Sequence, residues 1–413
     1  MFEKLVKIFK SIPDPRVQGR TKHQLWHMLT IAFMAIMAGS HGWKDIHSYG
    51  VANFVFFEGL LLGFTEMPSV DTIARTLSTL DPASFCDMLL KLAKDFLRCG
   101  QDRGPGRPNK ATPPVVISLD GKSVRGAVKP GEKKTKVHIV NTVCNQIVLF
   151  VMRVFEKSNE ITVIPVILEK LHKCGLLKGK VVTADAMGCQ KHIAEQIVGY
   201  RADYLFGLKG NHGTLLKDVQ SVFNKGLLEN EHEFDVGTYT SPADTISGRI
   251  ETRAITVVYL TTQTIKGWIT QMDEWAGIKA IIRVERHVDY PGERPTTIEV
   301  RYFITSLSLP PEQLLAITIE HWGVETVHGY LDDSETFAED KCKIHRGNGA
   351  EILSVFRKLA LNLLIPIKKM HDYAPSVKES VRTIIDLLNR SKDFLMEVLT
   401  KKPKDVTPPR QWR

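Results

Sequence analysis

Hydrophobic positions recur at helical spacing over the first hundred residues of this 413-residue chain. Apolar residues return every three or four positions, and N-cap signals at Ser69 and Asp81 precede two of the repeats. We therefore predict an all-helical N-terminal domain over residues 1–99, either a DNA-binding module or a plain helical bundle. The apolar segments are Met1–Ile12, Leu25–Ala38, Ala52–Phe64, Ile73–Leu80 and Ala83–Arg98.

From residue 114 the pattern changes to short apolar runs mixed with helical repeats. Three early runs predict strands in a meander, and helices then alternate with single strands. This order of elements is typical of a ribonuclease-H-like domain. The predicted strands are Val115–Leu119, Val137–Val143, Ile147–Phe155, Val181–Ala184 and Tyr204–Leu208, and the helices are Ile161–Lys173, Gln190–Tyr200 and Leu215–Leu227.

Four further strand patterns predict an all-β insertion at about residues 228–308. A helix then begins near Pro310 and runs through Glu325 towards Leu331. We expect an α/β fold: a ribonuclease-H-like catalytic domain over 114–370 with this insertion, preceded by the helical domain and a Pro/Gly linker at 100–113, and followed by a C-terminal helix and basic tail at 371–413. The insertion strands are Phe234–Thr240, Ile250–Tyr259, Ile278–Val288 and Thr297–Ile304, and the late helices are Ala350–Met370 and Ser376–Leu399.

Composition narrows the class of protein. A hydrophobic fraction of 43% is ordinary for a globular chain and argues against disorder. The 6 cysteines are scattered with no Cys-x-x-Cys, so a zinc site or a disulfide framework is not expected. The most apolar run, Leu25–Ala38, is too short to cross a membrane, and we expect no signal peptide, because Met1–Lys10 alternates charged with apolar residues. We expect a soluble protein of the cytoplasm.

Basic charge is concentrated in one region. The net charge is +9, and the segment Arg98–Lys136 holds ten Lys or Arg against three Asp or Glu. Such a concentration favours a polyanionic partner, although a solvated linker with incidental lysines is the alternative. Within it, Gly106–Pro108 is similar to short arms that enter A·T-rich minor grooves.

Two strand patterns end in a single acid. The run at Val115 leads into Asp120, and the run at Val181 leads into Asp185. Acids at the carboxyl edge of an open α/β sheet commonly belong to a site, whereas one such acid alone more often caps a turn. A third acid, Glu325, lies on the later helix, where a lone glutamate is ordinarily inert.

Together the three acids point to metal chemistry. Carboxylates that meet at one point repel each other unless cations neutralise them. Mg²⁺ suits such a cluster because it takes few carboxylates and fills its shell with water and phosphate oxygens. Two such ions promote in-line displacement at a phosphodiester.

These residues stand in motifs that resemble the DDE transposases of bacterial insertion sequences, in the group that includes the H-repeat-associated proteins. The resemblance covers nearly the whole chain. It implies that Asp120, Asp185 and Glu325 are the catalytic, metal-binding triad, with two Mg²⁺ ions that Mn²⁺ could replace. The motifs are Asp120-Gly121-Lys122, Arg125-Gly126, Glu156–Ile161, Asp185–Lys191, Leu208–Asn211 and His321–Glu325.

The resemblance also implies the reaction and its partners. The expected activity is hydrolysis at the ends of the element, followed by attack of the freed 3′-hydroxyl on target DNA. The partners are double-stranded DNA and a second copy of the chain in the synaptic complex, in the bacterial nucleoid. The expected DNA-phosphate contacts are Lys122, Arg125, Lys157, Lys209 and Asn211. For two of them a structural role is the alternative: Lys157 as a helix cap and Asn211 as a turn residue.

Several positions depart from the pattern of the group. Thr326 and Gly329 stand where Asn and Trp are usual, and the Tyr, Arg and Lys of broader relatives correspond here to Thr318, His321 and Asp332. These changes leave the triad intact and concern the handling of DNA ends. The alternatives are therefore an inactive or domesticated DNA-binding protein and a structure-selective nuclease of the same fold.

Overall fold

The fold is taken from a computed structural model of the chain. The predicted linker from residue 101 and most of the basic segment, including Arg125, lie outside the residues that the structure describes, and so does Lys157. The described residues are 1–17, 19, 21–100, 114–124, 126–127, 137–154, 160–246, 248–261, 267–290, 295–371 and 380–406.

The N-terminal residues form helices, as predicted, around one that is buried on all sides. In α2 every residue except Trp26 is buried, which fits its lack of a polar face. The apolar segment predicted at 52–64 begins inside one helix and continues in a second after Asn53. The helices are α1 (Phe2–Ser11), α2 (Leu25–Met37), α3 (Trp43–Ala52), α4 (Phe54–Leu60), α5 (Val70–Ser78) and α6 (Pro82–Gly100).

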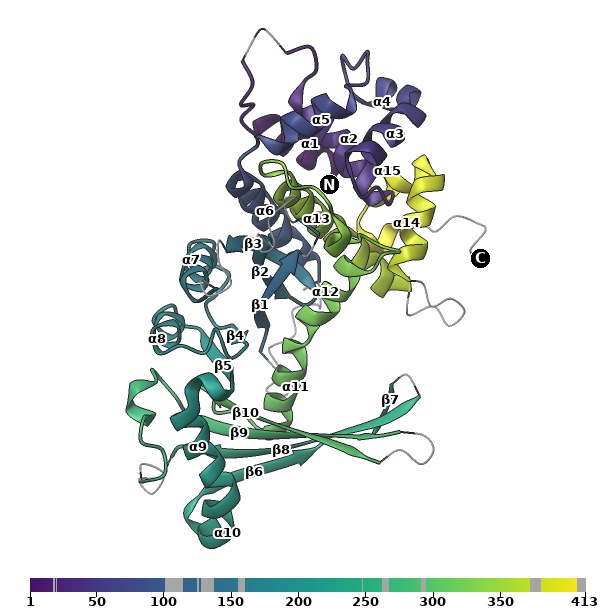
Figure 1. Ribbon diagram of the computed structural model, residues 1–413. Helices are drawn as coiled ribbons and strands as arrows, with labels where there is room; N and C mark the ends of the chain where they lie inside the picture. The colour runs from purple at the N-terminus through teal and green to yellow at the C-terminus, as the bar shows by residue number, and fades with distance from the viewer. Residues whose placement is uncertain are drawn as a thin grey trace.

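The last helices of the chain pack against the first ones (Figure 1). Helix α13 (Gly349–His371) contacts α2, α5 and α6, so the two ends of the chain share one helical layer. The single helix predicted at 376–399 is wrong. Two helices, α14 (Val381–Arg390) and α15 (Lys392–Thr400), meet at Ser391, whose side chain accepts a hydrogen bond from the Phe394 N–H and begins the second.

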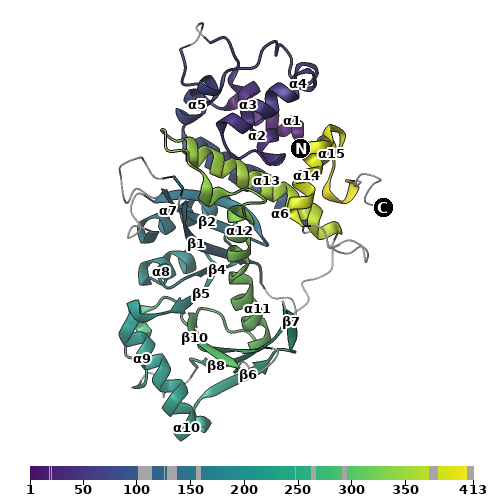
Figure 2. The same ribbon diagram turned by 45° about the vertical axis from the view of Figure 1, so that its right-hand side comes forward.

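The central sheet has the strand order β3-β2-β1-β4-β5. Strands β1, β2 and β3 are antiparallel neighbours, whereas β4 and β5 run parallel to β1. Helices α7 (Glu160–Lys173) and α8 (Lys191–Gly199) pack against this part of the sheet, and α6 and α13 contact β3 (Figure 2). The strands are β1 (Val116–Val124), β2 (Val137–Cys144), β3 (Ile147–Val154), β4 (Val181–Ala184) and β5 (Asp203–Leu208).

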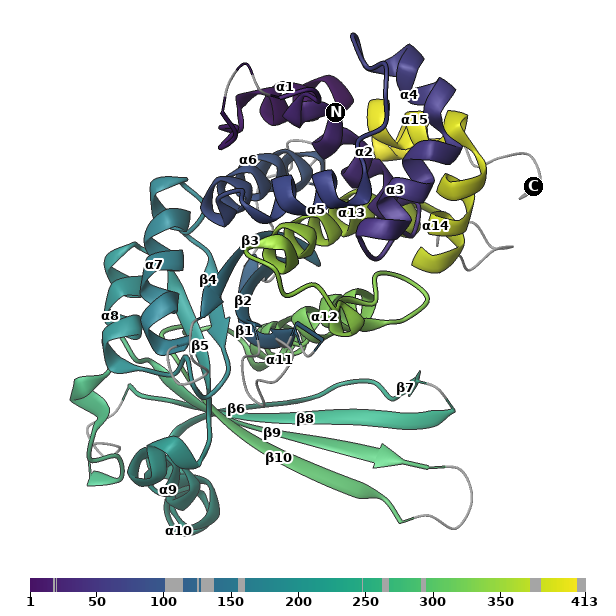
Figure 3. The same ribbon diagram turned by 45° about the horizontal axis from the view of Figure 1, so that its top comes forward.

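The predicted β insertion is continuous with this sheet. Its last strand pairs with β5, and the others extend outward in the order β10-β9-β8-β6, with the unpredicted β7 beside β8 (Figure 3). We call β6, β8, β9 and β10 the insertion sheet. Before it come α9 (Gly213–Ser221), a π-helical turn at Val222–Gly226 and α10 (Leu227–Asn230). The strands are β6 (Asp235–Thr240), β7 (Asp244–Ile246), β8 (Arg249–Tyr259), β9 (Ala280–Asp289) and β10 (Thr297–Thr305).

Two helices then return across the sheets. Helix α11 (Pro311–His321) covers an apolar face of the insertion sheet and also contacts β1, while α12 (Gly323–Asp332) lies against β1 and β2. The structure therefore has a helix boundary at Trp322 within the single helix predicted through Glu325. Among the described residues, no helix is both long enough and apolar enough to cross a membrane.

The β2–β3 hairpin generates a prediction about stability. Both residues of its turn have positive φ, 52° at Asn145 and 66° at Gln146. A type I′ turn requires this, and Gly adopts it without the steric cost that Gln incurs. We expect Gln146→Gly to raise the free energy of unfolding by roughly 0.5–1 kcal/mol, measured by urea denaturation. Asn145→Gly is the control and should change little, because Asn tolerates this conformation; a loss of stability in Gln146→Gly would contradict the prediction.

Candidate active site at the strand ends

The first two predicted acids lie on neighbouring parallel strands. Asp185 directly follows β4, whereas β1 continues past Asp120 to Val124, so the prediction that this strand ends at Leu119 is wrong. Leu119 of β1 is in register with Ala184 of β4, so Asp120 and Asp185 are the next residues on each strand. Ser118 and Thr183 each lie two residues before these acids, on the same face of the sheet, and the Thr183 hydroxyl donates to the Ser118 hydroxyl over 3.1 Å. Adjacent strands lie about 4.8 Å apart, so the fold brings the two aspartates side by side.

A tight turn holds Asp185. Its Oδ1 accepts hydrogen bonds from the backbone N–H groups of Met187 at 3.0 Å and Gly188 at 3.4 Å. A Cβ atom at Gly188 would lie 2.5 Å from the Ala184 Cβ, so only glycine lets this turn close against the strand. The small residues around Asp185 in the sequence are thus a packing requirement of the turn.

The loop after β5 supports the same turn. Asn211 donates from its amide to the Ala186 carbonyl oxygen, and a His212 ring nitrogen contacts the Cys189 carbonyl oxygen. The Asn211 amide is therefore engaged within the protein, as the structural alternative for this residue anticipates. Lys209, in contrast, is exposed, and its positive charge contributes to lowering the pKa of the partly buried His321.

The third acid lies on the helix that covers the strand ends. Glu325 is exposed on α12, and its backbone N–H bonds the Trp322 carbonyl oxygen. Four residues earlier, His321 Nδ1 lies 2.9 Å from the Thr183 hydroxyl, two residues before Asp185. Burial lowers the pKa of His321 to about 4, against the opposing effect of the Asp185 charge, so its imidazole is neutral near pH 7.

His328, three residues after Glu325 on α12, contacts residues of β1 and β2. Its Nδ1 lies 3.4 Å from Asp120 Oδ2, and its Nε2 lies 2.8 Å from the side-chain nitrogen of Asn141 on β2. Burial, with the nearby lysine charges, lowers the pKa of His328 to about 3. Sequence reasoning assigned no role to His328, although its spacing of three from Glu325 places the two on one helix face.

The helix boundary at Trp322 is itself held by the insertion sheet. The indole contacts two guanidinium groups, with distances from the ring centre of 5.4 Å to Arg253 of β8 and 4.8 Å to Arg301 of β10. Such cation–π contacts stabilise by about 0.5–2 kcal/mol each. The insertion sheet therefore helps to fix the start of the helix that carries Glu325.

Lys122, predicted to contact a DNA phosphate, is instead buried in the protein. Its side chain is only 6% exposed, and its ammonium group pairs with Asp332 of α12 and Glu339. Glu339 also pairs with Lys358 of α13 at 2.9 Å, and both of these side chains are fully buried. We call Lys122, Asp332, Glu339 and Lys358 the buried charge cluster.

The charges in this cluster stabilise each other. Burial alone would raise the pKa of Glu339, but the ammonium groups of Lys358 and Lys122 outweigh it and hold that pKa well below its ordinary value. Burial lowers the pKa of Lys358, against the opposing effect of Glu339. Lys122 thus holds β1 to the covering helices two residues beyond Asp120.

The three predicted metal-binding acids, Asp120, Asp185 and Glu325, are arranged only in part as a Mg²⁺ site requires. Among the described residues, no three His, Cys, Asp or Glu side chains are grouped as a metal site would require. The structure brings Asp120 and Asp185 together and places Glu325 on the covering helix, without closing the three into one group. Mg²⁺ needs only one or two carboxylates, so the paired aspartates fit it. Buried beside them, the Asn141 side-chain oxygen has no hydrogen-bond partner.

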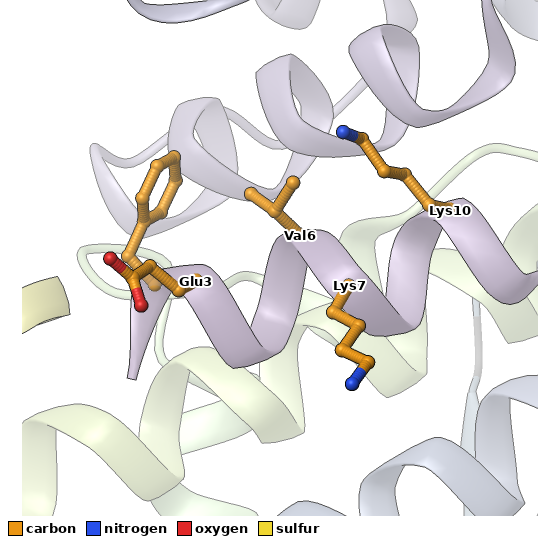
Figure 4. A pocket seen from close by; sticks show the side chains of 5 residues that line it. Glu3, Val6, Lys7 and Lys10 are labelled. Carbon is orange, nitrogen blue, oxygen red and sulfur yellow. The ribbon is translucent and has the colours of Figure 1, made fainter.

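A hollow elsewhere on the molecule takes no part in this arrangement. It has a volume of about 340 Å³ and lies along α1, lined by Phe2, Glu3, Val6, Lys7 and Lys10 (Figure 4). None of the predicted site residues lines it.

Comparisons with known proteins match nearly the whole chain. A family model described as a transposase DDE domain matches residues 111–363, and one described as DDE_Tnp_1-associated matches residues 6–93. Two similar relatives come from Escherichia coli. The "H repeat-associated putative transposase YhhI" of strain K12 is 32% identical over 88% of this chain and 90% of its own length. The "Putative transposase YncI" of O157:H7 is 32% identical over 88% and 87%.

A third relative comes from Xanthobacter autotrophicus. This "Uncharacterized protein in dhlA 3'region" is 32% identical over 73% of this chain and 94% of its own length. The similarity therefore extends beyond one genus.

The buried charge cluster generates a prediction about stability. Glu339→Gln keeps the shape of the side chain but leaves Lys122 and Lys358 without their shared carboxylate. Breaking a buried ion pair in this way costs about 3–5 kcal/mol. We expect a loss of that size in the free energy of unfolding, measured by urea denaturation.

The matched control is Glu335→Gln. Glu335 pairs with Arg382 at the surface, where the two side chains are 54% and 51% exposed. This change should cost less than about 1 kcal/mol. Equal losses in the two variants would show that the cluster does not contribute as described.

Proposed function

The chain belongs to the DDE transposase family, and on that basis we propose that it binds the terminal inverted repeats of an insertion sequence and catalyses metal-dependent DNA cleavage and strand transfer. The observation that carries the proposal is the in-register placement of Asp120 and Asp185 beneath the helix that bears Glu325. The strand order β3-β2-β1-β4-β5 supports a ribonuclease-H-like catalytic domain. The domain bounds of the sequence analysis remain part of this proposal.

We assign the cation site to the three acids. Asp120, Asp185 and Glu325 would hold Mg²⁺ ions, which when bound activate the attacking oxygen and stabilise the leaving oxygen of a phosphodiester. The turn hydrogen bonds to Oδ1 orient the Asp185 carboxylate. Glu325 is exposed, so a DNA strand can approach it from solvent.

The remaining predicted residues divide into two roles. Lys209, exposed at the end of β5, is proposed to contact a DNA phosphate, as are Arg125 and Lys157. Lys122 and Asn211 are proposed to act through position, because internal contacts engage both side chains. Phosphate contacts of this kind place the duplex without reading its sequence.

The main alternative is an inactive DNA-binding descendant of a transposase. The three departures from the broader relatives bear on it. Thr318 bonds the Leu315 carbonyl oxygen, His321 bonds Thr183, and Asp332 pairs with Lys122. Two of these replacements, His321 and Asp332, bind residues next to Asp185 and Asp120, which favours a changed but intact site over a decayed one.

Cleavage of DNA tests the proposal. The substrate is a linear duplex that carries the inverted repeat found beside the gene, incubated with Mg²⁺ or Mn²⁺. We expect nicking at the repeat end and a loss of about 100-fold or more in Asp185→Asn, the scale for removing one charge-stabilising group. Asn still accepts the turn hydrogen bonds, so the fold should persist. Asp87→Asn, which changes an exposed ion pair with Lys170, is the control.

The outcomes separate the three functions. Joining of the cut strand to a second duplex, lost together with cleavage in Asp185→Asn, supports a transposase. Cleavage without joining indicates a nuclease. Binding of the repeat without cleavage by the native chain would favour the inactive DNA-binding protein.

Lys209 gives a separate prediction about salt dependence. Each phosphate contact contributes about −0.9 to the slope of log affinity against log salt concentration for duplex DNA. We expect Lys209→Ala to make that slope less steep by about one contact, measured by fluorescence anisotropy. Lys173→Ala on α7, where the lysine pairs with Glu169, should leave the slope unchanged. An unaltered slope in Lys209→Ala would remove this residue from the DNA surface.

A further inference from the structure

His328 occupies a position between two neighbouring strands. Asp120 of β1 and Asn141 of β2 are directly opposite each other in the sheet, and the imidazole from α12 contacts both. His328 is only 14% exposed, and Asn141 is fully buried. The ring therefore connects the helix that carries Glu325 to the strand that carries Asp120.

The contacts of the ring define its tautomer. The Asn141 amide nitrogen can only donate, so the His328 Nε2 facing it must accept, and the proton then resides on Nδ1, toward Asp120. The reversed amide would put an unprotonated Nδ1 against the carboxylate and leave the buried N–H groups of Asn141 without an acceptor. Buried N–H groups without partners are rarer than under-satisfied carbonyl oxygens, which favours the first arrangement.

We propose that His328 is a positioning residue for Asp120: its Nδ1–H donates to Oδ2 and aims the carboxylate, while Asn141 fixes the tautomer that allows this. The proposal rests on the function proposed above for Asp120. Outer hydrogen bonds of this kind orient ligating carboxylates, and their loss typically costs 10- to 100-fold in metal affinity or activity.

A second connection runs parallel to the first. Lys122 follows Asp120 by two residues on the same face of β1, and Asp332 follows His328 by four on the same face of α12. Lys122 and Asp332 form an ion pair. These two contacts are two residues apart on β1 and four residues apart on α12. Together they fix both the distance of α12 from β1 and its rotation about its own axis. Glu325, one turn before His328, is thereby held at a set position relative to Asp120.

Two substitutions distinguish this role from simple packing. In His328→Asn the side-chain amide nitrogen corresponds to Nδ1 and can still donate toward Asp120. In His328→Gln the amide nitrogen corresponds instead to Nε2, on the Asn141 side. A packing role predicts no preference for Asn, whereas the positioning role predicts that only Asn restores function.

The measurement is Mn²⁺ binding to the full chain without DNA, by calorimetry. We expect His328→Ala and His328→Gln to weaken binding by about 10- to 100-fold, and His328→Asn to keep most of the native affinity. Thermal unfolding of each variant identifies any that fail to fold. Native affinity in a folded His328→Ala, or equal losses in the Asn and Gln variants, would overturn the proposal.

Asp120→Asn serves as the reference for the underlying site. If it leaves Mn²⁺ binding unchanged, the metal site of the proposed function is wrong. If it abolishes binding while the His328 variants bind normally, the metal site stands and only the role of His328 fails.

The tautomer provides a readout that needs no metal. In protein labelled with ¹⁵N-histidine, the ring signals of His328 are assigned by their disappearance in His328→Asn. We expect a protonated Nδ1 and an unprotonated Nε2 in metal-free buffer. An unprotonated Nδ1 would indicate that the ring offers a lone pair toward Asp120, as a metal ligand would, and would overturn the donor role.

Discussion

The buried carboxylate of Glu339 holds together the parts of the molecule on which the site depends. It pairs with Lys122 of β1 and Lys358 of α13, so the central sheet and the C-terminal helices share one anion away from water. Two buried ammonium groups around one carboxylate are costly to desolvate, and they are stable only in an arrangement that satisfies all three. Asp332 adds the end of α12 to the same cluster. The position of the helix above Asp120 is therefore fixed by charge as well as by packing.

Much of this fold follows from patterns within single segments. The apolar runs that lead into Asp120 and Asp185 form the first part of β1 and all of β4, and Asn145–Gln146 lies between the two strands predicted at Val137–Val143 and Ile147–Phe155. Of the two missed helix breaks, one lies where tertiary contacts override the local pattern. The break at Trp322 depends on guanidinium groups from two distant strands, and no periodicity in its own helix indicates it. The break at Ser391 was readable as a capping serine inside an otherwise helical pattern.

In the candidate site too, some features follow from the local sequence and others depend on tertiary contacts. The two acids are visible in the sequence because a run of apolar residues stops at each carboxylate, and the parallel register of β1 and β4 then brings Asp120 and Asp185 side by side. The partners of Lys122 are 210 and 217 residues away in the chain, so a lysine beside an acid was read as a DNA contact. Exposure could not be inferred from that motif. Lys209 also lies in a motif of the family but is exposed, so only the folded structure distinguishes the roles of the two lysines.

The replacements on the covering helix are best understood together with the strand beneath it. Where broader relatives are expected to carry a lysine, this chain has Asp332, and that acid pairs with Lys122 two residues after Asp120. A positive charge is thus present two residues from Asp120, but it is on β1 and is buried within the protein. Where an arginine is expected, the neutral His321 bonds Thr183 beside Asp185. Both changes exchange groups suited to DNA phosphates for groups that bind the helix to the sheet. In the proposed site these two side chains hold the covering helices to β1 and β4, and DNA phosphates would be met by exposed residues such as Lys209.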